Sequence, residues 1–166
     1  MKPLRLGAVL VGYLFVMISM IHSQGVPTNV EWPVAAGNAG GIRYSPLKQI
    51  NLSNVNQLEV AWTYDVSDGA GTLETNPIVV NGVLYGYTPA QKVFAVNAAT
   101  GQKLWQFDSG APARGNNRGV AYWSDGSQGR IFAGIREHVY SLDAETGKPD
   151  PKWGDGGRID FRAELR

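Results

Sequence analysis

Short apolar runs separated by turn signals dominate the middle of the chain. Between the first two of them stands Asn81-Gly82, the strongest short hairpin signal. Runs this short, joined by turns this tight, predict antiparallel strands that pair in sequence order. A four-stranded sheet is therefore expected from residues 74–107, with strands at Asn76–Val80, Val83–Tyr87, Val93–Asn97 and Lys103–Phe107.

Part of this pattern occurs twice. The stretch Phe94–Gln102 (FAVNAATGQ) returns as Tyr140–Lys148 (YSLDAETGK). A four-stranded unit that repeats at this spacing is typical of a β-propeller blade. A second blade is therefore expected over residues 118–161, with strands at Arg118–Trp123, Arg130–Gly134 and His138–Asp143.

The end of the second copy departs from the first. Residues 146–161 contain Pro149, Pro151 and several glycines, and both residue types interrupt sheet pairing. This segment is expected to be an insertion and not a strand.

A further strand is predicted before the first blade, at Leu58–Tyr64. Its Trp62 stands before the first blade as Trp105 stands before the second. We interpret it as a fourth-strand equivalent, of the kind that pairs with the last blade of a ring and closes it. Residues 26–57 form a lead-in rich in proline and glycine, with a short helical turn expected within Asn51–Leu58. Because closed propellers have about four to eight blades, a chain with two is expected to be the N-terminal part of a longer protein.

The first 25 residues have the order of an export signal. Lys2 and Arg5 precede the apolar run Leu6–Ile21, and small residues follow near Gly25. This order predicts a secretory signal peptide. An uncleaved N-terminal anchor remains open, because the run is only slightly shorter than the roughly 17 residues that span a membrane.

Composition removes several classes of function. The chain has no cysteine, which excludes a disulfide framework and a lipoprotein anchor, and its 15 basic and 14 acidic residues give no indication of nucleic-acid binding. No His/Cys/Asp cluster has metal-ligand spacing, and neither a Gly-x-Ser-x-Gly motif nor a dinucleotide fingerprint is present. Hydrolase and nicotinamide chemistry thus have no support, and no catalytic or metal-binding residue is expected in this chain.

Three motifs, in this order, resemble one family. Gly40–Leu47 (GGIRYSPL) is similar to the N-terminal lead-in of quinoprotein dehydrogenases, Ala95–Trp105 to their tryptophan-docking repeat, and Arg118–Trp123 (RGVAYW) to a segment near their cofactor. These enzymes are eight-bladed propellers that carry pyrroloquinoline quinone (PQQ) on the axis. The resemblance implies an all-β fold, of which this chain forms about two blades and a closing strand.

The docking repeat explains most of the tryptophans. Its glycine permits the positive φ of a tight turn, and its tryptophan packs between neighbouring blades and buries a large apolar area. Trp62, Trp105 and Trp153 are therefore expected to be structural. His138 stands alone in a predicted strand and is expected to be structural or exposed.

Two residues are the candidate cofactor-binding positions, Arg118 and Glu74. By residue type alone, the first is an ordinary surface charge and the second an exposed loop acid. The resemblance implies more. PQQ is a planar ortho-quinone with three carboxylates, so a guanidinium fork suits it. Glu74 matches a family glutamate that lies in the plane of the cofactor, where Arg118 would neutralise the cluster of carboxylates.

One departure from the family bears on the substrate. Methanol-type members carry adjacent cysteines at positions matching Pro112 and Ala113, and this chain has none. Membrane-type glucose and quinate dehydrogenases also lack the pair, and Thr146–Phe161 resembles theirs. The resemblance therefore favours a sugar or cyclic polyol over a simple alcohol.

The implied activity is that of an exported periplasmic oxidoreductase, and association with the membrane remains open. A sugar, polyol or alcohol hydroxyl would lose hydride to PQQ, with calcium as Lewis acid, and a respiratory quinone or cytochrome c would accept the electrons. The catalytic aspartate and calcium ligands are expected beyond residue 166. The alternative is a cofactor-free β-propeller scaffold of the outer-membrane assembly type. The absent lipidation cysteine and the intact Arg118–Trp123 motif argue against it.

Overall fold

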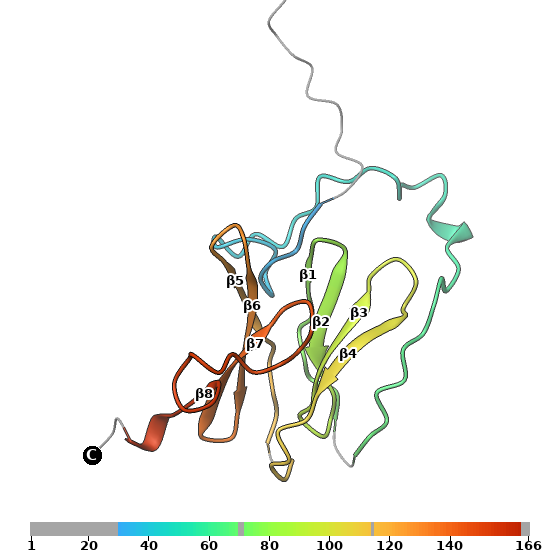
Figure 1. The fold of residues 1–166 in the computed structure, drawn as a ribbon. Coiled ribbons are helices and arrows are strands. Elements are labelled where there is room, and N and C mark those ends of the chain that lie inside the picture. The colour runs from blue at the N-terminus through green and yellow to red at the C-terminus, as the bar shows by residue number, and fades with distance from the viewer. Residues whose placement is uncertain (1–29, 70–71, 114, 164–166) are drawn as a thin grey trace, which may run out of the picture.

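The computed structural model describes residues 30–69, 72–113 and 115–163. Its strands form two four-stranded antiparallel sheets that lie side by side (Figure 1). In each sheet the strands are neighbours in sequence order, which confirms the two expected blades of an all-β propeller. The first sheet comprises β1 (Ile78–Val80), β2 (Val83–Tyr87), β3 (Val93–Asn97) and β4 (Lys103–Phe107), and the second β5 (Ala121–Ser124), β6 (Gly129–Ile135), β7 (His138–Asp143) and β8 (Arg158–Asp160).

The turns follow directly from local sequence. Asn81 and Gly82 both have positive φ, 51° and 73°, as a two-residue hairpin turn between β1 and β2 requires. In the repeated turn after β3, the Asn97 carboxamide oxygen accepts hydrogen bonds from two backbone N–H groups at 2.9 and 3.0 Å. After β7, the Asp143 carboxylate does the same at 3.2 and 2.8 Å. The repeated sequence thus folds into a repeated turn.

The main core lies between the two sheets. Alternate residues of each sheet face the other, as the two-residue period of a strand dictates. The larger fully buried side chains at this interface are Ile78, Tyr87 and Val93 from the first sheet and Ile131, Ile135 and Leu142 from the second. Each blade therefore depends on its neighbour for burial.

Trp105 on β4 seals the same interface. Its indole N–H donates to the Ala144 carbonyl at 2.9 Å, and its ring lies on Gly147, where an added Cβ would come within 2.5 Å of a ring carbon. Trp62 repeats the arrangement one blade earlier: its indole N–H donates to the Ala98 carbonyl at 3.1 Å, and its ring covers Gly101, where an added Cβ would come within 2.6 Å of a ring carbon. The structural role expected of both tryptophans is confirmed.

The segment Leu58–Tyr64, expected as a strand, forms no strand in the part of the chain that the structure describes. It packs on a face of the first sheet, where Tyr64 stacks on Phe94 of β3 with ring centroids 5.0 Å apart. Since β3 is an inner strand, no strand edge is available there for backbone pairing. Its role as the closing strand of a ring remains a prediction.

The interpretation of residues 146–161 as an insertion was too broad. Residues 158–160 form β8, which pairs with β7 through Val139 and Ile159. Only residues up to 157 form the irregular connection, which a partly buried ion pair between Arg130 and Asp150 fastens to β6. Residues 158–160 form a strand because they follow the last glycine of this segment and lie beside the unpaired edge of β7, whose backbone groups pair with them.

Trp153 does not take the docking position. Trp105 pairs with Ala95 across β3 and β4, and Ser141 is the residue that matches Ala95 in the repeat. The N–H of Ser141 donates to the Gly157 carbonyl at 2.9 Å, and its carbonyl accepts from the Asp150 N–H at 2.8 Å, so Trp153 is not its backbone partner. Trp153 instead packs on Phe132 of its own blade, with ring centroids 5.5 Å apart. It is structural, but within a blade.

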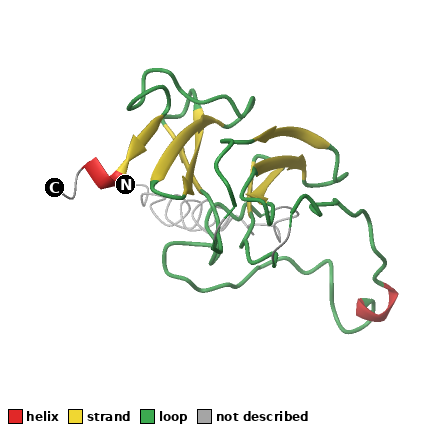
Figure 2. Ribbon diagram, turned by 90° about the horizontal axis from the view of Figure 1, so that it is seen from below, coloured by secondary structure: helices red, strands yellow, loops and turns green. Residues whose placement is uncertain are grey.

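The lead-in pairs with the edge strand β1, and the loop that carries its short 3₁₀ helix extends away from the two sheets (Figure 2). Trp32 and Val79 of β1 exchange two backbone hydrogen bonds of 2.8 Å, and the short 3₁₀ helix η1 (Val55–Gln57) confirms the expected helical turn. A second one, η2 (Phe161–Ala163), follows β8. The expected export signal over residues 1–25 lies outside the described residues. Within those residues, no helix is long and apolar enough to cross a membrane.

Candidate functional site

Both candidate residues stand just before the first strand of a blade. Glu74 precedes β1, and Arg118 precedes β5. Asn76 joins these two segments, because its backbone N–H and its side-chain amide both donate to the Arg118 carbonyl, at 2.8 and 3.1 Å. We call Glu74, Asn76, Arg118 and Gly119 the inner corner.

Gly119 allows the segment that carries Arg118 to approach the backbone of Asn76 closely. Its φ is 151°, and a Cβ at this position would lie 2.8 Å from the Asn76 carbonyl oxygen. A side chain would therefore push the two segments apart. The glycine that follows the arginine in the Arg118–Trp123 motif thus serves the geometry of the inner corner.

Arg118 and Glu74, which sequence reasoning selected separately, form an ion pair with Nη1 and Oε2 3.2 Å apart. The arginine side chain is 76% exposed and the glutamate 28% exposed. A pair this open contributes only about 0–1 kcal/mol to stability. Since guanidinium has five N–H donors, Arg118 can keep Glu74 and still bind a second anionic group.

A small cavity of about 10 Å³ lies beside Glu74. Gln91, Gly115 and Asn117 also line it, and the side-chain nitrogen of Asn117 is buried there with no hydrogen-bond partner among the described atoms. The volume is that of about one water molecule. Sequence reasoning missed Asn117 and Gln91; the irregular loop before Arg118 was the only signal for either.

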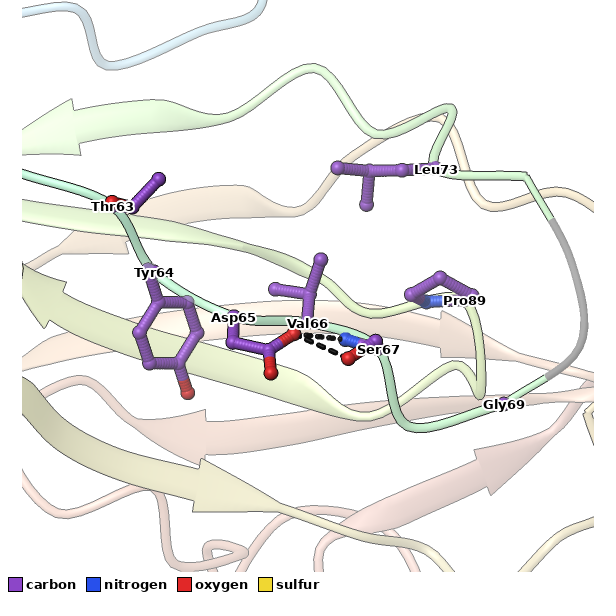
Figure 3. Close-up of a pocket in the computed structure, with 8 residues that line it drawn as sticks. All are labelled: Thr63, Tyr64, Asp65, Val66, Ser67, Gly69, Leu73 and Pro89. Carbon is purple, nitrogen blue, oxygen red and sulfur yellow. Dashed lines mark hydrogen bonds between the residues drawn. The ribbon is translucent and has the colours of Figure 1, made fainter. Parts of the chain in front are cut away.

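A wide, open hollow of about 740 Å³ lies along residues 63–67, with Leu73 and Pro89 opposite (Figure 3). Its carboxylate, Asp65, turns back to Ser67, and hydrogen bonds from that serine hold the pKa of Asp65 below its ordinary value. The described residues that line this hollow include no arginine or lysine, so they do not match an anionic ligand as the inner corner does. In the residues that the structure describes, no three His, Cys, Asp or Glu side chains gather as a metal site would require.

Comparisons with known proteins place this chain in one family. The family model "PQQ: Glucose/ethanol/alcohol dehydrogenase, beta-propeller domain" matches residues 32–166. The chain is 38% identical over 141 residues to the "Alcohol dehydrogenase (quinone), dehydrogenase subunit" of Gluconacetobacter polyoxogenes, covering 78% of this chain and 18% of that protein. It is 35% identical over 127 residues to the "1-butanol dehydrogenase (cytochrome c)" of Thauera butanivorans, covering 71% of this chain and 18% of that protein.

The fold agrees with a solved relative. The crystal structure of quinohemoprotein alcohol dehydrogenase from Comamonas testosteroni superposes with a TM-score of 0.64 at 29% identity, covering 75% of this chain and 19% of that one. The chain therefore spans about a fifth of the length of the relatives that it matches. With the match from residue 32 onward, the two blades and their docking tryptophans, these comparisons show that the chain belongs to the family of PQQ-dependent dehydrogenase β-propellers.

Proposed function

We propose that this chain is part of an exported PQQ-dependent dehydrogenase that oxidises an alcohol or sugar hydroxyl, and that the inner corner contacts the cofactor. The observation that carries the proposal is the Arg118–Glu74 pair. Its two members come from different blades, meet at 3.2 Å, and leave most of the guanidinium exposed.

The side chains of the inner corner suit PQQ by charge and donor type. Arg118 offers a planar fork to a carboxylate, while Asn117, one residue before it, has a buried amide nitrogen with no partner in the described residues. Glu74 alone would repel an anionic ligand, so its pairing with Arg118 is what makes the corner acceptable to one. When bound, PQQ supplies the hydride acceptor; the residues of this chain bind and orient it.

The substrate and acceptor are proposed from the relatives. Two of them are named for alcohols, one for quinone and one for cytochrome c, which supports a simple alcohol as substrate and either acceptor for the electrons. The sugar or cyclic polyol indicated by the missing cysteine pair stays a proposal beside it. Calcium and the catalytic aspartate are proposed to be bound or supplied outside these residues.

Export to the periplasm is proposed from Lys2, Arg5 and the run Leu6–Ile21. Mature protein from a periplasmic extract is expected to begin near Gly25 when its N-terminus is sequenced. If the N-terminus is an intact Met1, the segment is an uncleaved anchor and not a cleaved signal peptide.

The decisive experiment is the substitution Arg118→Ala in the complete protein. Loss of a partly buried, charge-assisted contact is expected to cost about 2–5 kcal/mol, which is roughly 30-fold to several-thousand-fold in PQQ affinity. Activity should fall at limiting PQQ and recover in part when PQQ is raised with calcium present. Arg118→Lys should restore only part of the affinity, and Glu74→Gln should have a milder effect.

Arg162 offers a matched control, because it is also an exposed arginine paired with carboxylates, at Asp160 and Glu137. Arg162→Ala should leave PQQ affinity unchanged. Equal affinity in Arg118→Ala and wild type would make Arg118 an ordinary surface charge and remove the cofactor role of the inner corner.

A further inference from the structure

We propose that Gln91 is a positioning residue that sets the place of Arg118 at the inner corner. The proposal rests on the proposed function, since it assigns Gln91 a part in holding the cofactor contact. Gln91 lies on the turn between β2 and β3, far in sequence from the residue that it positions.

The conformation of Gln91 is unusual for its residue type. Its φ is 62°, a left-handed value that glycine or asparagine adopts with less strain. The turn itself is closed by backbone bonds of 2.9 Å, from Gln91 to Thr88 and from Thr88 to Lys92. Nothing in this turn requires a long amide side chain, yet the residue is only 5% exposed. Its side chain therefore serves a contact outside the turn.

That contact is with the loop before Arg118. The Gln91 side-chain nitrogen donates to the Gly115 carbonyl at 2.9 Å. Three residues later, the Arg118 carbonyl is held by Asn76. The segment 115–118 is thus fixed at both ends, by the first blade in each case.

Fixing this segment matters because the guanidinium has little else to hold it. Among the described residues its one partner is Glu74, in an open ion pair, and such a pair is weak. The position of the guanidinium is therefore set mainly by the backbone that carries it. Since a misplacement of about 1 Å can cost a large factor in a positioned contact, a shift at Gly115 should reach the cofactor.

The cavity beside Glu74 provides a second link. Gln91, Gly115 and Glu74 all line it, so the Gln91–Gly115 bond forms part of the wall next to the acidic member of the pair. Losing the bond would open this wall at the same time as it frees the loop. Both effects act on the Arg118–Glu74 pair.

The test is Gln91→Glu, which keeps the shape of the side chain but turns an acceptor toward the Gly115 carbonyl. Gln106→Glu on β4, where the glutamine is exposed, makes the same chemical change away from the corner. PQQ is titrated into the cofactor-free complete protein, and binding is followed by tryptophan fluorescence. We expect the dissociation constant to rise about 10- to 100-fold in Gln91→Glu and less than about 2-fold in Gln106→Glu.

A double-mutant cycle separates positioning from general stabilisation. If Gln91 acts through Arg118, Gln91→Glu should add less than about 2-fold once Arg118→Ala is present. Full additivity would show an effect independent of Arg118 and would overturn the inference.

Amide hydrogen exchange in the cofactor-free protein gives a readout that needs no PQQ. Exchange at the Asn76 amide, which donates to the Arg118 carbonyl, should accelerate in Gln91→Glu and not in Gln106→Glu. Unchanged protection would overturn the inference while leaving the proposed function intact. A wild-type protein that fails to bind PQQ, with exchange accelerated as expected, would instead overturn the proposed function and leave Gln91 as a loop anchor.

Discussion

At the scale of single residues, the docking glycines meet two demands that can be separated. Gly147 has a φ of 70° and lies under the Trp105 ring, whereas Gly82 has a φ of 73° with nothing within 4 Å of an added Cβ. The two positions thus share a backbone conformation and differ in surroundings. They form a matched pair for measuring what the tryptophan contact adds.

We predict that Gly147→Ala destabilises the complete protein more than Gly82→Ala does. Left-handed strain costs both variants about 1–2 kcal/mol, and the collision with the Trp105 ring adds about 1–3 kcal/mol of overpacking to the first alone. Thermal unfolding of both variants measures the difference. Equal losses would mean that the ring moves aside freely and that the docking contact is loose.

The roles of individual residues, in the inner corner and outside it, could be predicted from the sequence to different degrees. Arg118 and Glu74 were selected as candidates because a short motif surrounds each of them, and their role in binding a cofactor stays a prediction. Asn117 and Gln91 were not, because a polar residue in a loop or turn is ordinary in sequence and becomes unusual only when the fold buries it. Trp153 is structural, as its spacing predicted, but its backbone register, set by Gly157, places it within its own blade and not at a docking position.

At the scale of elements, local turn chemistry made the hairpins predictable. Asn81-Gly82 and the repeated turns fix their own registers, so the strands beside them were located to within a few residues. The stretch 58–64 forms no strand here, because an extended, apolar sequence becomes a strand only beside a free strand edge, and its role as a closing strand stays a prediction. Residues 158–160 were expected to be irregular because they follow several glycines. They form a strand because the edge of β7 is free to pair with them.

β2 connects the blades through a hydrogen bond that responds to pH. The Tyr85 hydroxyl donates to the Ala144 carbonyl at 3.2 Å, and burial raises the pKa of Tyr85 from 10.0 to about 12. Because the folded state holds this proton more tightly than the unfolded state, the associated stability is complete below pH 10. It is lost as the pH rises from 10 to 12.

We predict that Tyr85→Phe weakens the fall in stability between pH 10 and 12, by about 2–3 kcal/mol over the range. At neutral pH the variant should lose only about 0.5–1.5 kcal/mol, since Trp105 still donates to Ala144. Denaturant unfolding at several pH values measures both. Tyr44→Phe, at an exposed tyrosine, is the control, and parallel curves for Tyr85→Phe and wild type would contradict the assignment.

At the scale of the whole molecule, the chain leaves much apolar surface uncovered, before the blades as well as on them, where Leu104 and Trp123 are each 48% exposed. Leu52 is 98% exposed and Val60 83% exposed, and the stability of repeated units depends on their neighbours. We predict that the chain from residue 26 onward, produced alone, melts broadly or associates. Calorimetry together with a mass measurement in solution tests this; a sharp transition at monomeric mass would contradict it.

The docking contacts also have a direction. In both of them the tryptophan comes first along the chain and its glycine seat later, Trp62 before Gly101 and Trp105 before Gly147. A ribosome that adds about 5–20 residues per second needs roughly 2–8 s to make the forty or so residues between them. Each tryptophan is therefore translated seconds before the glycine turn on which its ring packs. During that time the side of the blade that will face its neighbour stays exposed to solvent, with its apolar residues uncovered.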